Sequence, residues 1–146
     1  MFELMFVLVV LGVMALLLAP GMREYLIAQR VRALANDLAS DLMLARSEAL
    51  KRNATAQLVP QGIGPEAGWI VSAGNLVLSW RGAVANGVVV DGAAPTIMFN
   101  ASGRMRLPAT QLRMTVRPRD GPTAGTSRCV ELDLSGRVRT YGGVCA

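Results

Sequence analysis

The fold is decided by the first 53 residues, MFELMFVLVVLGVMALLLAPGMREYLIAQRVRALANDLASDLMLARSEALKRN (residues 1–53). Residues 4–19 are apolar without interruption, which predicts about 24 Å of helix at 1.5 Å per residue. Residues 1–22 together reach the roughly 20 residues that a bilayer core requires. Glu3 lies at the edge of this run, and an ionisable group in a membrane segment indicates a functional role unless it merely sits among the lipid headgroups.

The helical pattern continues beyond the apolar run. Pro20 and Gly21 predict a kink. Apolar residues then recur every three or four positions, at Ile27, Val31, Leu34, Leu38, Leu42, Ala45 and Ala49. This spacing predicts a helix that packs one apolar stripe onto a sheet, and Asn53 is the expected stop signal. A cleaved secretory signal ending at Ala19 is the rival interpretation, but it lacks a basic n-region and is followed by proline.

From residue 54 onward, short β-prone runs alternate with Gly, Pro and Asn. The spacing is typical of an antiparallel sheet or a small sandwich. The expected strands span 55–59, 69–72, 76–80, 88–90, 96–99, 111–117, 129–134 and 137–141. The sequence therefore predicts an α+β fold in three parts: a membrane half of the helix (1–22), an amphipathic half (23–53) and a β-domain (54–146).

The net charge of +5 is concentrated in the last third of the chain. Residues 1–100 hold seven basic and seven acidic groups, whereas residues 101–146 hold eight arginines against Asp120, Glu131 and Asp133. Arginine suits bidentate contacts with phosphate. The asymmetry indicates a polyanionic partner; a solvated basic face without a partner is an equally simple interpretation.

The composition argues against an enzyme. The chain has no histidine, which excludes a Ser-His-Asp triad, a Cys-His dyad and most catalytic zinc sites. Ser47 and Lys51 are best interpreted as a solvent-facing helix pair. We expect no catalytic residue, no metal and no cofactor. In an exported domain Cys129 and Cys145 are expected to form one disulfide, which stabilises a loop of this size by roughly 3 kcal/mol.

One pattern, Ser-Gly-Arg-x-Arg, occurs twice, at residues 102–106 and 135–139. Ser-Gly suits a tight turn. On a strand the two arginines would point to the same face, about 6.6 Å apart, with Met105 or Val138 pointing inward between them. Such a pair is suited to bridging phosphates of a nucleic-acid backbone. A hairpin whose outward positions happen to be arginine remains the alternative for both copies.

Several features together resemble the type IV pilin and type II pseudopilin superfamily: Glu3 in an apolar segment, Pro20 seventeen residues later, and a long amphipathic helix leading into a β-domain. More narrowly, the chain resembles the GspH/FimT family of minor pilins and pseudopilins. The matching segments are residues 36–38, 44–53 (LARSEALKRN), 68–71 (GWIV), 97–104 and 135–139 (SGRVR). These segments are spread over nearly the whole chain and occur in the same order as in members of the family.

The resemblance implies a type IV pilin-like fold and a FimT-like minor pilin of a type IV pilus. The alternative is a GspH-like minor pseudopilin of a type II protein secretion system. In either case the resemblance implies a single-pass protein of the bacterial inner membrane with a periplasmic C-terminal domain, which joins other pilin or pseudopilin subunits in a filament.

The resemblance also assigns roles to individual residues. Glu3 matches the glutamate that acts in filament assembly by offsetting the methylated terminal amine of a neighbouring subunit. Prepilin peptidase is an expected partner if a leader lies upstream of Met1. Gly136, Arg137 and Arg139 match a Gly-Arg-x-Arg motif that binds double-stranded DNA in FimT-like members. That role is not carried over to residues 103–106, which share only the pattern.

Overall fold

The computed structural model describes residues 2–84, 87–92, 96–120 and 125–146, without the side chains of 15–21. Its first element is one helix, α1 (Phe2–Arg52), of 51 residues, which is about 76 Å long at 1.5 Å per residue. The helix ends at the predicted stop signal, because Asn53 adopts a left-handed φ of 49°. The Ala54 N–H donates to the Ala49 carbonyl over 3.1 Å, which satisfies one of the last helical acceptors.

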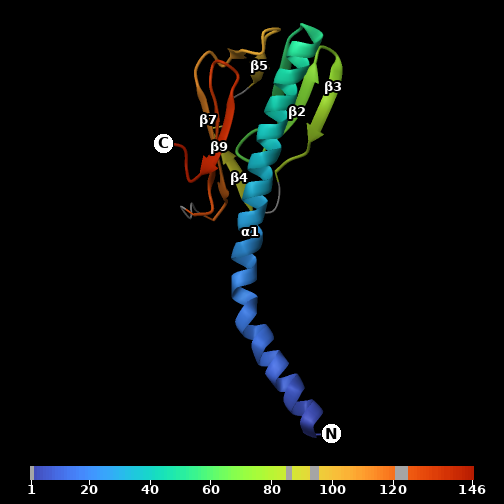
Figure 1. Ribbon diagram of the computed structural model, residues 1–146, viewed down its shortest axis with the longest axis vertical. Helices are drawn as coiled ribbons and strands as arrows, with labels where there is room; N and C mark the ends of the chain where they lie inside the picture. The colour runs from blue at the N-terminus through green and yellow to red at the C-terminus, as the bar shows by residue number, and fades with distance from the viewer. Residues whose placement is uncertain (1, 85–86, 93–95, 121–124) are drawn as a thin grey trace.

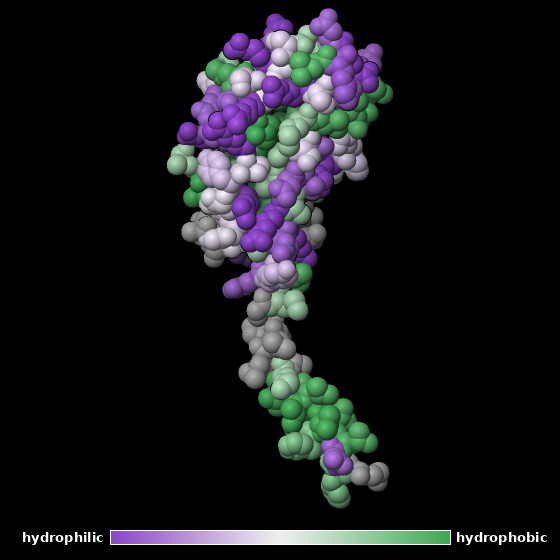
Figure 2. Space-filling view, viewed as in Figure 1, coloured by the Kyte–Doolittle hydropathy of each residue, from purple (hydrophilic) through white to green (hydrophobic). Residues whose placement is uncertain are grey.

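The N-terminal part of α1 projects away from the rest of the molecule (Figure 1). The side chains of residues 2–14 are all exposed, and Figure 2 shows hydrophobic residues covering this end. The helix continues through Pro20 and Gly21, and its axis changes direction between the projecting part and the part that packs on strands (Figure 1). Within the described residues, no helix combines the length and the apolar character needed to cross a membrane.

The amphipathic half of α1 buries the predicted stripe. Six of its seven residues are buried, and Ile27 at its start is half-buried. Two further alanines, Ala35 and Ala39, are buried as well. They lie one position beyond Leu34 and Leu38, so the buried face is wider than the predicted stripe. Their small side chains let the helix approach the strands closely.

The strands form two antiparallel sheets. The first has the order β3-β2-β1-β5-β6, with bounds β1 (Ala56–Gln61), β2 (Gly68–Ala73), β3 (Leu76–Arg81), β5 (Ile97–Phe99) and β6 (Met105–Leu107). The second has the order β4-β7-β8-β9, with bounds β4 (Val88–Asp91), β7 (Leu112–Pro118), β8 (Arg128–Leu132) and β9 (Val138–Gly142). In Figure 1, β2 and β3 lie on one side of α1 and β7 and β9 on the other.

The core lies where α1 meets both sheets. The helix contacts β1 and β2 of the first sheet and β7, β8 and β9 of the second. Phe99, Leu42 and Ile97 are the largest fully buried side chains. The predicted fold, a long N-terminal helix packed on antiparallel strands, is therefore confirmed.

Eight of the nine strands in the described part of the chain coincide with predicted runs, with ends shifted by a few residues. The prediction missed β6. This strand has three residues, and only Met105 among them is buried, so it is too short to show an alternating pattern. The prediction also began the last strand at Arg137, whereas β9 begins at Val138.

A polar cluster fastens α1 to the first sheet. The indole N–H of Trp69, which is buried, donates to Asp41 Oδ2 over 2.6 Å. Arg81 lies over the Trp69 ring, 5.5 Å from its centre, and its Nη2 pairs with Asp37 Oδ2 at 2.8 Å. Asp37 and Asp41 lie one helical turn apart on α1. The same side of the helix therefore binds Trp69 of β2 and Arg81 of β3.

Candidate functional site

The second Ser-Gly-Arg-x-Arg copy is a tight turn between β8 and β9. Asp133 Oδ1 accepts three hydrogen bonds: from the Ser135 N–H (2.8 Å), the Ser135 hydroxyl (2.5 Å) and the Arg137 N–H (3.1 Å). Gly136 adopts a φ of 78°, which favours glycine. The Ser135 hydroxyl, the Arg137 and Ser135 N–H groups and the charge of Arg139 hold the pKa of Asp133 below its ordinary value of 3.8. The turn is therefore built around an ionised carboxylate at neutral pH.

The first copy, between β5 and β6, has the same construction. Asn100 Oδ1 accepts from the Ser102 N–H (3.1 Å), the Ser102 hydroxyl (2.8 Å) and the Arg104 N–H (3.0 Å). Gly103 adopts a φ of 71°. An amide oxygen thus occupies the place of the Asp133 carboxylate. The sequence repeat is a repeat of structure.

The two turns pack against each other. The Met105 N–H donates to the Leu134 carbonyl over 3.2 Å. A Cβ on Gly136 would lie 2.2 Å from the Gly103 carbonyl oxygen, so only glycine permits this approach. We call this pair, residues 100–104 and 133–137, the double turn. Its two halves are far apart in the sequence, and the sequence pattern did not predict that they meet.

The double turn lies against the last turns of α1. A Cβ on Gly103 would lie 3.1 Å from the Leu50 side chain, and one on Gly136 would lie 3.2 Å from Arg46 Nε. Arg46 Nε is buried and has no hydrogen-bond partner among the described residues. The C-terminal end of α1 is opposite the projecting N-terminus (Figure 1). The double turn is therefore at the far end of the molecule.

The arginines are arranged differently from the prediction. We expected both arginines of each copy on a strand. Instead, Arg104 and Arg137 lie in the turns, while Arg106 and Arg139 lie on β6 and β9. The inward position of the residue between them agrees with the prediction, since Met105 is buried and Val138 packs against the core.

These four arginines are exposed, and none of them forms an ion pair with a described residue. Three other arginines of the last third are paired with acids. Arg113 pairs with Glu131 and Arg119 with Glu66, at 3.4 and 2.6 Å, and Arg117 pairs with Asp91. Of the arginines in this third that form no ion pair with a described residue, four lie in the double turn or on the strands that follow its halves, and the fifth, Arg128, begins β8.

A disulfide holds the C-terminal segment beside β7. Cys129 and Cys145 form the expected bond, with their Cα atoms 5.1 Å apart. The Cys145 N–H also donates to Thr115 Oγ1 over 3.1 Å. The bond encloses the second turn and β9, and so restrains the chain on both sides of Arg137 and Arg139.

The comparison with protein families decides the relationship. The family model of the type II transport protein GspH matches residues 34–136. The chain belongs to the GspH family. The expected resemblance to the GspH/FimT family is thereby confirmed, and the match includes most of the buried stripe of α1 and both glycines of the double turn. A comparison with curated protein sequences found no match.

Solved structures with the same fold are a minor pilin and a minor pseudopilin. The type IV minor pilin FimU of Pseudomonas aeruginosa has a TM-score of 0.63 at 20% identity, over 77% of this chain and 89% of FimU. The minor pseudopilin EpsH from the Type 2 Secretion System of Vibrio cholerae has a TM-score of 0.57 at 14% identity, over 77% of this chain and 97% of EpsH. At these identities the likeness shows the fold alone. Together with the family match, it makes the chain a member of a minor pilin and pseudopilin family, and such proteins interact with other pilin subunits.

Glu3 of this GspH-family chain lies in the first turn of α1 and is exposed. Its neighbours on the helix surface, three and four positions on, are the apolar side chains of Phe6 and Val7, which are 71% and 48% exposed. Glu3 is therefore the only acid among residues 2–14, which are otherwise apolar. Its role in assembly stays a prediction.

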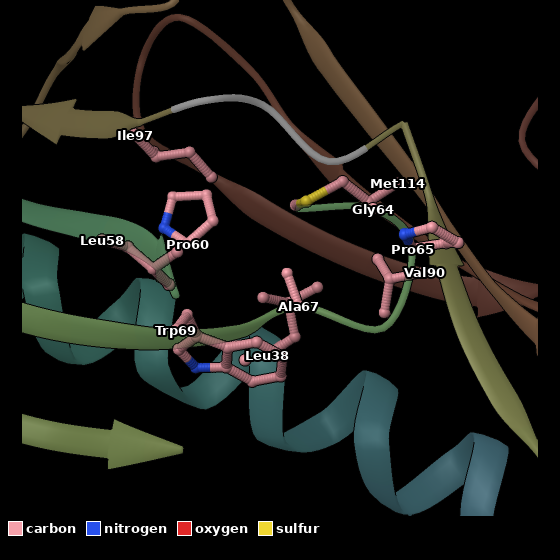
Figure 3. Close-up of a pocket in the computed structure, with 11 residues that line it drawn as sticks. Leu38, Leu58, Pro60, Gly64, Pro65, Ala67, Trp69, Val90, Ile97 and Met114 are labelled. Atoms are coloured by element: carbon pink, nitrogen blue, oxygen red, sulfur yellow. The ribbon is translucent and has the colours of Figure 1, made fainter. Parts of the chain in front are cut away.

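The apolar cavity at the centre of this family member is too small for a ligand, whereas a more open hollow of about 290 Å³ lies between α1 and residues 81–84. An apolar cavity of about 30 Å³ lies between Leu38 of α1 and residues of both sheets, including Trp69, Ile97 and Met114 (Figure 3). Ligand pockets are roughly ten times larger or more.

Ser47 donates to the Leu44 carbonyl and Lys51 pairs with Glu48, so these two side chains do not form a catalytic pair. No three metal-binding side chains are grouped among the described residues.

Sequence reasoning missed Arg46 and the contact between the turns. Arg46 belongs to the LARSEALKRN segment that carries the family resemblance, but the sequence alone did not predict a role for it. A stronger signal was available in the repeat. Asn100 and Asp133 stand at the same distance before Ser-Gly-Arg in both copies, and such a residue commonly accepts backbone N–H groups two positions on.

Proposed function

We propose that the protein is a FimT-like minor pilin that binds double-stranded DNA through Arg137 and Arg139. The observation that carries the proposal is that Arg137 in the turn and Arg139 at the start of β9 are both exposed within the loop closed by the Cys129–Cys145 disulfide. Arginine donates in a planar fork that matches phosphate oxygens. Because the contacts go to the backbone and not to base edges, binding is independent of DNA sequence.

We further propose that the N-terminal part of α1 anchors the chain in the inner membrane, with the strands in the periplasm, and then enters the filament. The uninterrupted apolar run of residues 4–19 supports this. Glu3 would compensate the terminal amine of a neighbouring subunit, since an unpaired charge in a low-dielectric core is costly. Processing by prepilin peptidase follows if a leader precedes Met1.

The DNA proposal is tested with the full-length chain in a non-ionic detergent. Fluorescence anisotropy with two unrelated duplexes gives the affinity as a function of salt. The double variant Arg137→Gln/Arg139→Gln should bind more weakly, and the slope of log K against log salt should fall by about 1.8, since each phosphate contact contributes about 0.9.

A matched control makes the result specific. Arg23→Gln/Arg119→Gln removes the same charge elsewhere, because Arg23 lies on the exposed surface of α1 and Arg119 pairs with Glu66. This variant should keep the slope of the unaltered chain. If the slope of log K against log salt falls by the same amount in both double variants, net charge and not the turn determines binding.

The second candidate is a GspH-like minor pseudopilin of a type II secretion system. The description of the matching family, a type II transport protein, favours it. On this alternative the head contacts other pseudopilins and not DNA. Co-purification from cells that encode both machines separates the two, because a pseudopilin is recovered with secretion-system subunits and a minor pilin with pilus subunits.

A further inference from the structure

We infer that both halves of the double turn form one composite site for the phosphate backbone of duplex DNA, an inference that rests on the proposed function. The proposed function needs only Arg137 and Arg139. The composite site adds Arg104 and Arg106, to which the family resemblance assigned no role, and Arg46 of α1, whose Nε lies against Gly136. Three segments that are distant in the sequence therefore contribute to a single basic surface.

The first step is that the site is pre-organised. Each turn is fixed by an oxygen that accepts three hydrogen bonds, from Asn100 in one and Asp133 in the other. The halves are then joined by the Met105–Leu134 hydrogen bond and the close approach of Gly136 to the Gly103 carbonyl. The backbone that carries the arginines is thus ordered before any ligand arrives, which lowers the entropic cost of binding.

The second step is that the site keeps an excess of positive charge, because the two turns and the strands that follow them carry four arginines against the single acid of the turns. Asp133 is the only acid in either turn, and its Oδ1 is already occupied by three donors. Its lowered pKa follows from the Ser135 hydroxyl first and the Arg137 N–H second. Arg113, Arg117 and Arg119 are each paired with an acid, so they add little positive potential of their own. Positive potential is therefore focused at the double turn.

The third step is that Arg46 brings a further positive charge close to the double turn. Its Nε is buried without a partner among the described residues, and it lies where a Cβ on Gly136 would be 3.2 Å away. Buried polar groups normally have a hydrogen-bond partner. Because this Nε is buried, a phosphate at the double turn would not reach it, but the guanidinium charge of Arg46 adds to the positive potential there.

The repetition itself favours DNA over an acidic protein. Two copies of one turn present the same donors twice, which suits a ligand that is itself a repeat. A duplex offers one phosphate about every 3.4 Å along each strand. An acidic protein surface has no such regularity, so it would not require the second copy to match the first.

The experiment uses the full-length chain in a non-ionic detergent, a random-sequence duplex, and the slope of log K against log salt. With four arginine contacts the unaltered chain should have a slope of about −3.6, at about 0.9 per phosphate. Arg104→Gln/Arg106→Gln and Arg137→Gln/Arg139→Gln should each remove about 1.8 of it, and the quadruple variant should retain almost none. Arg23→Gln/Arg119→Gln is the charge-matched control, and thermal unfolding verifies that every variant is folded.

The outcomes separate this inference from the proposed function. If Arg104→Gln/Arg106→Gln keeps the slope of the unaltered chain while the other pair lowers it, the composite site is wrong and the proposed function stands. If neither pair changes the slope, both are wrong. If the unaltered chain does not bind the duplex at about 50 mM salt and instead crosslinks to another subunit through position 137, the surface is a protein interface and both are overturned.

Discussion

At the scale of single residues, Asp133 and Asn100 perform the same task with different chemistry. Each side-chain oxygen organises its turn through three hydrogen bonds. Asp133 is negative and Asn100 is neutral. The second turn therefore carries a charge that opposes a polyanionic ligand, although the same charge strengthens the bonds that hold the turn. The two contributions can be separated by substitution.

Asp133→Asn should keep the turn and remove the opposing charge, so DNA binding should become roughly twofold to fivefold tighter, as expected for one surface charge interaction. Asp133→Ala removes the same charge but also the acceptor, so the turn should loosen and binding should become weaker than in the unaltered chain. Anisotropy titration at fixed salt measures both. If Asp133→Ala also tightened binding, net charge and not turn geometry would govern affinity.

Acid provides an independent test of the same residue. The folded pKa of Asp133 is lowered from 3.8, chiefly by the Ser135 hydroxyl and then by the Arg137 N–H. The stabilisation from the charged turn is thus fully present above the unfolded pKa and is lost as the pH falls through the folded pKa. Part of the decline in stability below about pH 4 should therefore be absent in Asp133→Asn, as urea unfolding at a series of pH values would measure.

At the scale of elements, the contact between α1 and the first sheet depends on a polar group at a buried position. The indole N–H of the buried Trp69 donates to Asp41 Oδ2. Asp41→Ala should lower the free energy of unfolding by about 1–3 kcal/mol, because a buried donor loses its acceptor. Asp41→Asn keeps an oxygen there and should cost less. Urea unfolding followed by tryptophan fluorescence compares the two, and equal losses would show that the charge of Asp41 matters and not its acceptor.

The elements also show how far the sequence predicts the fold. The buried stripe of α1 was predictable because Val31, Leu34, Leu38 and their successors recur at helical spacing, and this local signal survives in the folded chain. Strand β6 was not predictable, because one buried residue in three forms no pattern. The place of Arg137 before β9 was missed for a related reason: the Asp133 side chain takes its N–H, which the strand prediction assigned to the sheet.

The site was predictable only in part. The sequence identified Arg137, Arg139 and the cysteine pair because motif and spacing are local features. It gave no indication that Gly103 would touch Gly136 or that Arg46 would lie beside them. Those contacts depend on how α1 and the edges of two sheets meet at one end of the molecule, and a linear pattern does not contain that information.

At the scale of the whole molecule, the proposed assembly residue and the proposed DNA site are separated by the length of α1. From Glu3 to Arg46 the helix axis extends about 65 Å at 1.5 Å per residue. The Debye length at physiological salt is about 8 Å. Electrostatic coupling between the two ends is therefore negligible, and assembly and DNA binding should respond to mutation independently.

Glu3→Gln should lower the amount of protein in the sheared filament fraction at least about tenfold, because an uncompensated terminal amine in an apolar core costs about 3–5 kcal/mol. The same variant should bind DNA with the salt slope of the unaltered chain. Arg137→Gln/Arg139→Gln should have the opposite effects: the protein should remain in the filament fraction, and the slope of log K against log salt should become smaller. Immunoblots of sheared filaments and anisotropy titrations measure the two properties separately. If Glu3→Gln altered DNA binding by the detergent-solubilised chain, α1 would transmit a structural change from its N-terminus to the β-domain. The two sites would then not be independent.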